Sequence, residues 1–429
     1  MKKLESLKHS PFDWQLLAVV LLMLSIPAIY NSYSIYLIGR WPPSENGLPI
    51  VAQGQFLQVF IEVLQEALII PLFFFVGSQR FKHQPELLER VRTALLLVFL
   101  LLLLVTTILQ ATLPFFVDHL QIDGAISAKT TAYLRIQLVA TLFLVLNMGL
   151  IIVFEVLSKR KVLITLLFIR LVTRILFDAL LYGSYPFSLN LGVEGVALSS
   201  TLTEGIVLLV SLLFLQKTLG VKLNEWLQPI RFSAVWLFAR VSKWIAIESG
   251  IRNIAYFFVI LSLINQLGSK QMGGYYLSMH LFWSFCLLPV NATAEVLKAQ
   301  IGNYAAEKQK IVRLLLSGLA IGLAVTLSGW LLLYLYLNPI LHFLNNDPEV
   351  IQYGEYAFKA LIIPYILLAF NIIADSAFVG TGKTQFLAYQ SIFTNLLVYG
   401  MAYLAYWAGW WTPSFGSILL VFSLGILLD

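Results

Sequence analysis

The feature that most constrains this chain is a series of long, uninterrupted apolar segments. Twelve such segments follow one another, each close to the roughly 20 residues whose helix crosses about 30 Å of hydrocarbon. Their approximate ranges are 14–39, 54–77, 93–117, 131–157, 161–183, 192–215, 243–266, 274–301, 312–337, 355–380, 384–408 and 413–428. Polar and apolar residues do not alternate in them, as they would in a membrane barrel. The sequence therefore predicts an all-α membrane protein with twelve transmembrane helices.

Composition agrees with this interpretation. Hydrophobic residues make up 59% of the chain and charged residues 12%, about half the charged share of a soluble domain. Cys286 is the single cysteine, which excludes an intramolecular disulfide and the usual cysteine-based metal sites. The five histidines share no metal-ligand spacing. We therefore expect no metal and no cofactor.

Lysine and arginine are distributed unevenly among the predicted loops. Twenty of the 28 lie at the N-terminus or in alternate loops after it, whereas the opposite loops hold four: Arg40, Lys129, Arg135 and Lys270. Basic residues accumulate on the cytoplasmic side, so both termini are expected in the cytoplasm, in a multi-pass protein of the plasma or inner membrane. The net charge of +6 then reflects the orientation of the chain in the membrane, and no nucleic-acid partner is expected.

The longest polar interruption lies midway along the chain, with six apolar segments on each side. It predicts an N-terminal six-helix bundle at 1–215, a cytoplasmic linker at 216–242 and a C-terminal six-helix bundle at 243–429. Residues 161–183 and 383–406 are weakly alike, which indicates a parallel repeat and hence two pseudo-symmetric bundles. Such bundles are typical of alternating-access transporters, with a central cleft.

Nine ionisable side chains lie well inside the predicted spans. They are Glu62, Glu66, Arg170, Arg174, Asp178, Glu204, Glu248, Arg252 and Asp375. At about 2.5–3.5 kcal/mol each, their insertion costs on the order of 25 kcal/mol unless they are paired or hydrated. Charges inside spans usually mark a substrate or ion pathway.

The stretch RLVTRILFDALLYG, 170–183, places Arg170, Arg174 and Asp178 on one helix face, because each is four residues from the next. Two interpretations stay open. Arg174 and Asp178 form a static pair, or Asp178 titrates or binds an ion while Arg174 replaces sodium beside it. A neighbouring cation favours the ionised carboxylate, so Asp178 is expected to be a poor proton carrier.

A second polar stripe occupies one face of the span at 54–77. It comprises Gln55, Gln58, Glu62, Gln65 and Glu66. It either supplies hydrogen bonds between helices or forms a polar wall of the cleft, with Glu66 as a candidate proton carrier.

The second half repeats the pairing. Glu248 and Arg252 are four residues apart, and Asp375 lies near the end of the span at 355–380. Glu248 and Asp375 are both candidate functional acids.

Several motifs resemble those of multidrug and toxic compound extrusion (MATE) transporters, in the MOP superfamily that also holds lipid-oligosaccharide flippases. LGVEGVALSSTLTEG (191–205) is similar to the start of the family's sixth span, FDALLYG (177–183) to the end of the fifth, and FVGTGKTQF (378–386) to the turn between the tenth and eleventh. The resemblance implies a secondary active transporter that works by alternating access.

The resemblance also implies positions for ion coupling. The family places it on an Asp in span 1, an Asn and an Asp four apart in span 5, and a hydroxyl in span 6. The corresponding residues here are Ser34, Arg174, Asp178 and Ser200, so two of the four positions depart from the pattern. Some members use a glutamate in span 7, which Glu248 matches, and on this resemblance we favour Glu248 over Asp375 as the functional acid.

These features together predict export of an amphipathic organic compound in exchange for an ion, a proton rather than sodium. The expected partners are a small amphipathic or anionic substrate and the lipid bilayer, and the protein is expected to be a monomer. One alternative is a flippase for a lipid-linked or phosphate-bearing substrate, favoured by Arg170, Arg174 and Arg252 because guanidinium binds phosphate well. Another is a scaffold that does not transport. An enzyme is disfavoured because the loops are short, and GTGKT (380–384) lacks the spacing of a nucleotide-binding loop.

Overall fold

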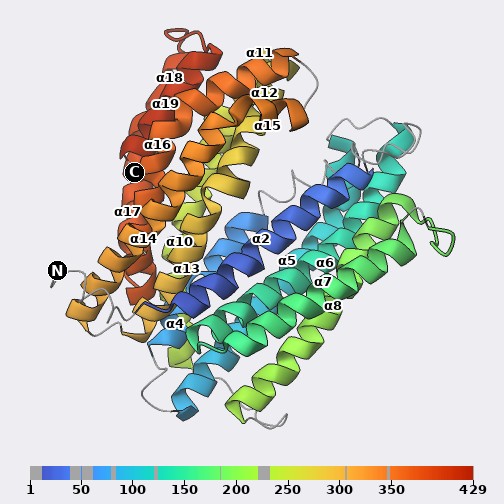
Figure 1. The fold of residues 1–429 in the computed structure, drawn as a ribbon, viewed down its shortest axis with the longest axis vertical. Coiled ribbons are helices and arrows are strands. Elements are labelled where there is room, and N and C mark those ends of the chain that lie inside the picture. Colours follow the sequence, from blue (N-terminus) through green and yellow to red (C-terminus); the bar gives the residue numbers. More distant parts are fainter. Residues whose placement is uncertain are drawn as a thin grey trace. The chain divides into compact units, whose positions relative to one another are not determined.

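Helices are the regular elements of the computed structural model, which is drawn in Figure 1. It describes residues 12–38, 50, 61–78, 84–119, 124–183, 185–220, 232–304, 307–344 and 348–428. Within these ranges no strand occurs. The predicted all-α class is confirmed.

Contacts within the chain divide it into two units. The N-terminal unit is Leu22–Arg240, and the C-terminal unit combines Met1–Leu21 with Val241–Asp429. Helix extends into the predicted linker from both sides, because α8 ends at Leu219 and α10 begins at Phe232, while 221–231 lie outside the described residues. The linker at 216–242 and the bundle boundaries at 1–215 and 243–429 stay predictions.

The N-terminal unit contains the helices that carry the charged stripe. Its helices are most of α2 (Trp14–Ile38), the helical residues 61–69, α4 (Leu72–Gly77), α5 (Gln84–His119), α6 (Gly124–Val156), α7 (Arg160–Leu181) and α8 (Gly192–Leu219). Proline has no N–H to continue a helical ladder, and a turn at Ile70 and Pro71 accordingly separates 61–69 from α4.

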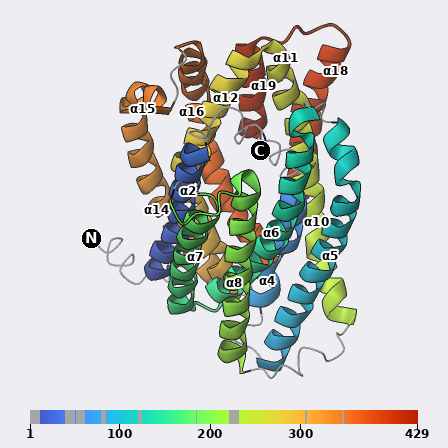
Figure 2. The same ribbon diagram turned by 90° about the vertical axis from the view of Figure 1, so that its right-hand side faces the viewer.

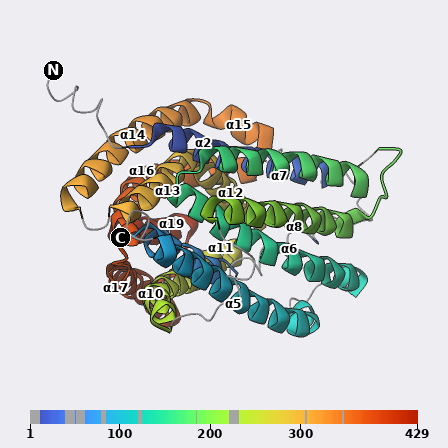
Figure 3. The ribbon, with the colours of Figure 1, turned by 90° about the horizontal axis from the view of Figure 1, so that it is seen from below.

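The connection between α7 and α8 holds the two helices together. The backbone N–H groups of Leu189 and Leu191 donate to the carbonyl oxygens of Leu180 and Leu181, at 2.7 and 2.8 Å. These two carbonyls belong to the last turn of α7, where carbonyl oxygens have no N–H partner within the helix. Figure 3 shows α6, α7 and α8 running side by side. The α7 stripe therefore has α8 as a near neighbour.

The C-terminal unit contains several helices that are interrupted along their length. They are α10 (Phe232–Ala255, from Val241 on), η2 (Tyr256–Leu261), α11 (Ser262–Leu267), α12 (Ser269–Leu281), η3 (Phe282–Cys286), α13 (Leu288–Asn303), α14 (Lys308–Leu335), α15 (Leu337–Leu344), α16 (Pro348–Thr381), α17 (Gln385–Thr394), η4 (Asn395–Gly400), α18 (Met401–Trp407) and α19 (Phe415–Leu428). The elements η2, η3 and η4 are π-helical. Each of the three lies inside a different predicted span. Each of these three spans is therefore a run of three helical elements, with the π-helix in the middle.

Close packing in this unit depends on glycine and aromatic residues. A Cβ at Gly274 of α12 would lie 2.5 Å from the Cβ of Tyr353 of α16, so glycine permits this approach. Phe282 of η3 stacks on Tyr365 of α16, with ring centroids 4.0 Å apart. The indole N–H of Trp330 donates to the carbonyl of Cys286 at 3.0 Å, which satisfies a backbone group at the end of η3.

Five helices in the described ranges are long and apolar enough to cross a membrane. They are Glu86–Phe115, Ser127–Val156, Gly192–Leu219, Phe232–Ile264 and Pro348–Thr381. A sixth is formed if the end of α14 and α15, bent by 73°, count as one span; Figure 2 shows α15 turned away at the end of α14. The chain is thus a multi-pass all-α membrane protein, and the number twelve stays a prediction.

Candidate functional site

The charged stripe of α7 faces α8 inside the N-terminal unit. Arg170, Arg174 and Asp178 each contact a polar side chain of α8, as the four-residue spacing requires of one helix face. Asp178 is buried, and Arg170 and Arg174 are partly buried. The predicted ion pair of Arg174 and Asp178 is present.

Asp178 is surrounded by hydrogen-bond donors. The hydroxyl of Tyr30 donates to Oδ2 and the hydroxyl of Ser199 to Oδ1. The Nε of Arg174 lies 3.2 Å from Oδ1 and 3.4 Å from Oδ2. Arg174 also donates to the hydroxyl of Ser200, which donates in turn to the carbonyl of Val196 at 3.1 Å. Side chains of α2, α7 and α8 therefore hold this carboxylate, and both of its oxygens accept hydrogen bonds. The guanidinium of Arg174 lies beside it, where a bound cation would have to lie.

One turn away, a second acid–base pair joins α6, α7 and α8. The Nη2 of Arg170 lies 2.9 Å from Oε2 of Glu204. The same oxygen accepts from Nδ2 of Asn147 at 2.7 Å, and Asn147 also donates to the carbonyl of Glu204 at 2.9 Å. Asn147 is fully buried. The network is thus a ladder of two ion pairs along the α7–α8 contact.

The acids of the second polar stripe differ in accessibility. Glu62 is exposed and Glu66 is half-buried. Gln65 between them donates to the sulfur of Met148 at 3.0 Å, which ties this stripe to α6. Ser34 lies in α2 where only the backbone is described, and Gln55 and Gln58 lie outside the described residues.

In the C-terminal unit the predicted pair of Glu248 and Arg252 is present. The Nε of Arg252 lies 3.0 Å from Oε1 of Glu248, and the Arg252 side chain is 45% exposed. The hydroxyl of Ser391 donates to the carbonyl of Glu248 at 3.3 Å, which ties α10 to α17. Asp375 of α16 is half-buried. Glu248 is therefore paired, like Asp178, but with a much more accessible cation.

Four members of the ladder were absent from the predicted site: Tyr30, Asn147, Ser199 and Glu204. Glu204 was found among the charges inside the predicted spans but was not chosen as a site residue, and Asn147 could have been found because an amide inside an apolar span needs a partner. Tyr30 and Ser199 gave no such signal. The resemblance indicated Ser200 as the hydroxyl near Asp178, but Ser199 makes that contact and Ser200 contacts Arg174.

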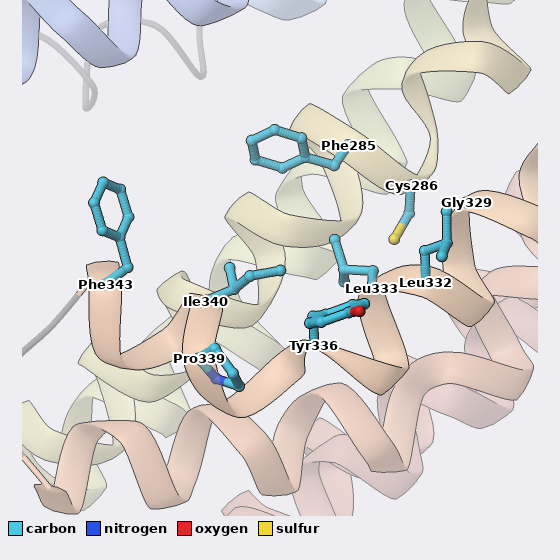
Figure 4. A pocket seen from close by; sticks show the side chains of 9 residues that line it. All are labelled: Phe285, Cys286, Gly329, Leu332, Leu333, Tyr336, Pro339, Ile340 and Phe343. Atoms are coloured by element: carbon cyan, nitrogen blue, oxygen red, sulfur yellow. The ribbon is translucent and has the colours of Figure 1, made fainter.

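An apolar recess lies at the bend between α14 and α15 (Figure 4). Its volume is about 560 Å³, within the range of small-molecule sites. It is lined by Phe285, Cys286, Gly329, Leu332, Leu333, Tyr336, Pro339, Ile340 and Phe343. Because none of these described lining residues is charged, the recess suits hydrocarbon and offers nothing to an ion.

Comparisons with known proteins agree with this architecture. The MatE family model matches residues 247–404. The probable multidrug resistance protein NorM of Thermotoga maritima is 21% identical over 263 residues, which cover 58% of this chain and 55% of that protein. The chain therefore matches about half the length of this relative.

Solved structures match over more of the chain. A mutant of the Vibrio cholerae MATE transporter VcmN has a TM-score of 0.80 at 16% identity, covering 96% of this chain and 92% of that one. A MOP superfamily transporter from Pyrococcus furiosus, described by the reverse polarity of its binding pocket, has a TM-score of 0.81 at 16% identity, covering 96% and 91%. At such identities the likeness concerns the fold.

Proposed function

The predicted resemblance to the MATE family is confirmed, and on that premise we propose that this chain is a secondary active transporter. It exports a small amphipathic organic compound in exchange for an ion by alternating access. We place it as a monomer in the plasma or inner membrane, with both termini in the cytoplasm. The named relatives are transporters or a multidrug resistance protein, which supports transport over an enzymatic role.

One observation supports the proposal more than any other. The chain matches the MATE fold over 96% of its length, and its C-terminal half also matches in sequence. This chain also carries charges inside its spans, where charges are costly and usually mark a substrate or ion pathway.

The geometry around Asp178 favours a proton over sodium as the coupling ion. Sodium would need oxygen ligands around an open position, but the guanidinium of Arg174 lies 3.2 Å from Oδ1. The fixed guanidinium of Arg174 would repel a sodium ion that entered that place. Glu66 and Glu248 are half-buried acids and are our coupling candidates outside the ladder, with Asp375 behind Glu248.

A second candidate function is flipping of a lipid-linked or phosphate-bearing substrate. Arg170 and Arg174 on the α7 stripe, and the accessible Arg252, favour anionic groups. The Pyrococcus furiosus transporter shows that this fold also occurs with a pocket of reverse polarity.

Reconstitution into liposomes tests both functions. Purified protein is given imposed proton or sodium gradients and screened with cationic dyes and anionic amphiphiles. We expect proton-dependent movement that weakens in Glu66→Gln or Glu248→Gln and is unchanged in Glu307→Gln, whose side chain is 51% exposed in a surface pair. Strong sodium-driven uptake abolished by Asp178→Asn would overturn the proton-coupled exporter. Retention of an anionic lipid without dye efflux would favour the flippase.

A further inference from the structure

The two carboxylates of the α7–α8 ladder differ in how completely they are hydrogen-bonded. From this difference we infer that Glu204, not Asp178, is the acid of the α7–α8 ladder that takes up and releases a proton. The inference rests on the proposed function and deepens it, because it names a coupling residue that the family resemblance does not indicate.

Both oxygens of Asp178 already accept a hydrogen bond from a hydroxyl group. Oδ1 accepts from Ser199 and Oδ2 from Tyr30, while Arg174 lies within 3.4 Å of both oxygens. A carboxylic acid has a donor where the carboxylate had an acceptor. Protonating Asp178 would therefore require the hydroxyl of Ser199 or Tyr30 to turn from donor to acceptor, because Arg174 can only donate.

Glu204 accepts its hydrogen bonds on one oxygen. Arg170 and Asn147 both donate to Oε2, and in the described part of the chain no group donates to Oε1. The side chain is 12% exposed, compared with 6% for Asp178. A proton can add to Oε1 while Oε2 keeps both of its donors, because the carbonyl oxygen of the acid still accepts.

Asn147 offers a partner to either form of Glu204. Its Nδ2 donates to the carboxylate, and its buried Oδ1 has no hydrogen-bond partner among the residues described. Buried amide oxygens are usually paired, so this unused acceptor needs an explanation. An asparagine presents a donor to a carboxylate and an acceptor to a carboxylic acid, which suits a neighbour that changes between the two.

The charged groups facing Glu204 come from α7. Arg170 is its ion-pair partner, Arg174 is engaged one turn away by Asp178 and Ser200, and α6 presents the neutral Asn147. When Glu204 takes a proton, the net charge of its pair with Arg170 rises from zero to +1. This happens about 18 Å from the start and 22 Å from the end of α8, near the middle of a span. Proton uptake is thus tied to a change of charge where charge is most costly.

Infrared difference spectra between acidic and neutral pH test this assignment on the full chain in phosphatidylcholine vesicles. We expect one carbonyl band of a buried protonated carboxyl group to be present in the wild type and in Asp178→Asn and to be missing from Glu204→Gln, while the bands of other acids such as Glu66 and Glu248 stay. Loss of the band in Asp178→Asn, or its persistence in Glu204→Gln, would overturn the inference.

Glu204→Asp covers the case in which Glu204→Gln does not fold. The shorter side chain keeps a carboxyl in a changed setting, so the band should move; an unmoved band would refute the assignment. Because the spectra need no substrate and no gradient, they are independent of the transport assay. A band that follows Glu204 in a protein that moves no compound would count against the proposed function and leave the proton site standing.

Discussion

Removing one partner of the Arg174–Asp178 pair should destabilise the N-terminal unit far more than removing both. In Arg174→Met, Asp178 keeps the hydroxyls of Tyr30 and Ser199 but loses the cation beside it. In Asp178→Asn, Arg174 keeps Ser200 as its partner. In the double variant neither charge remains, and the amide introduced in place of the carboxylate can still accept from a hydroxyl.

The size of the effect follows from burial. The side chains are 19% and 6% exposed, so the pair belongs with buried ion pairs. Breaking such a pair on one side costs about 3–5 kcal/mol, because a charge is left uncompensated. For a unit of about 220 residues, each kcal/mol lowers the melting temperature by about 2–4 °C. Each single variant should therefore melt about 6–20 °C lower, whereas the double variant should melt closer to the wild type than either single variant does.

Thermal melting of purified protein in one detergent measures the cycle, with the four proteins compared side by side. Lys310→Met, in the exposed pair of Lys310 and Glu307, serves as a control and should melt like the wild type. If the two single losses simply add in the double variant, the pair is not a closed buried interaction and the reasoning about Asp178 fails.

Two further predictions concern the same chain. Replacing potassium by sodium at equal ionic strength should leave the melting temperature unchanged, because the guanidinium of Arg174 lies where a cation beside Asp178 would bind. A sodium site filled at 100 times its Kd would add about 2.7 kcal/mol to the free energy of unfolding. A rise of several degrees in sodium would therefore contradict the prediction. Gly274→Ala should cost about 1–3 kcal/mol by overpacking, since the added methyl would meet Tyr353 at 2.5 Å and the Gly354 nitrogen at 2.7 Å. Gly250→Ala, with nothing within 4 Å of its Cβ, is the matched control and should melt no lower than the wild type, whereas equal losses in both variants would show that close packing is not the cause.

The sequence predicted those parts of the structure that depend on one helix at a time. Apolar length located the five helices of the described residues that are long enough to cross a membrane. Four-residue spacing located the pairs Arg174–Asp178 and Glu248–Arg252, because both partners of each pair lie on one helix face. The span predicted to end at 337 breaks next to Tyr336, before a proline.

Contacts between helices could not be predicted in the same way. The pairing of Arg170 with Glu204 joins α7 to α8 and depends on how the two helices are rotated about their axes. The same rotation decides that Ser199 rather than Ser200 meets Asp178, since neighbouring residues point about 100° apart. The π-helical elements have no local sequence signal, and Tyr30 became a site residue only because α2 packs against α7 at Asp178.

The π-helical turns of η2, η3 and η4 change the direction in which the side chains beyond them point. A π turn takes in about one residue more than an α turn, so everything beyond it is rotated by roughly 100° relative to an unbroken α-helix. A single-residue deletion within Tyr256–Leu261, Phe282–Cys286 or Asn395–Gly400 would therefore restore an α turn and leave the side chains beyond it on the faces that they occupy now. The same deletion in an α-helical part of these spans would turn the far half of the helix by roughly 100° and carry side chains from the protein interior toward lipid.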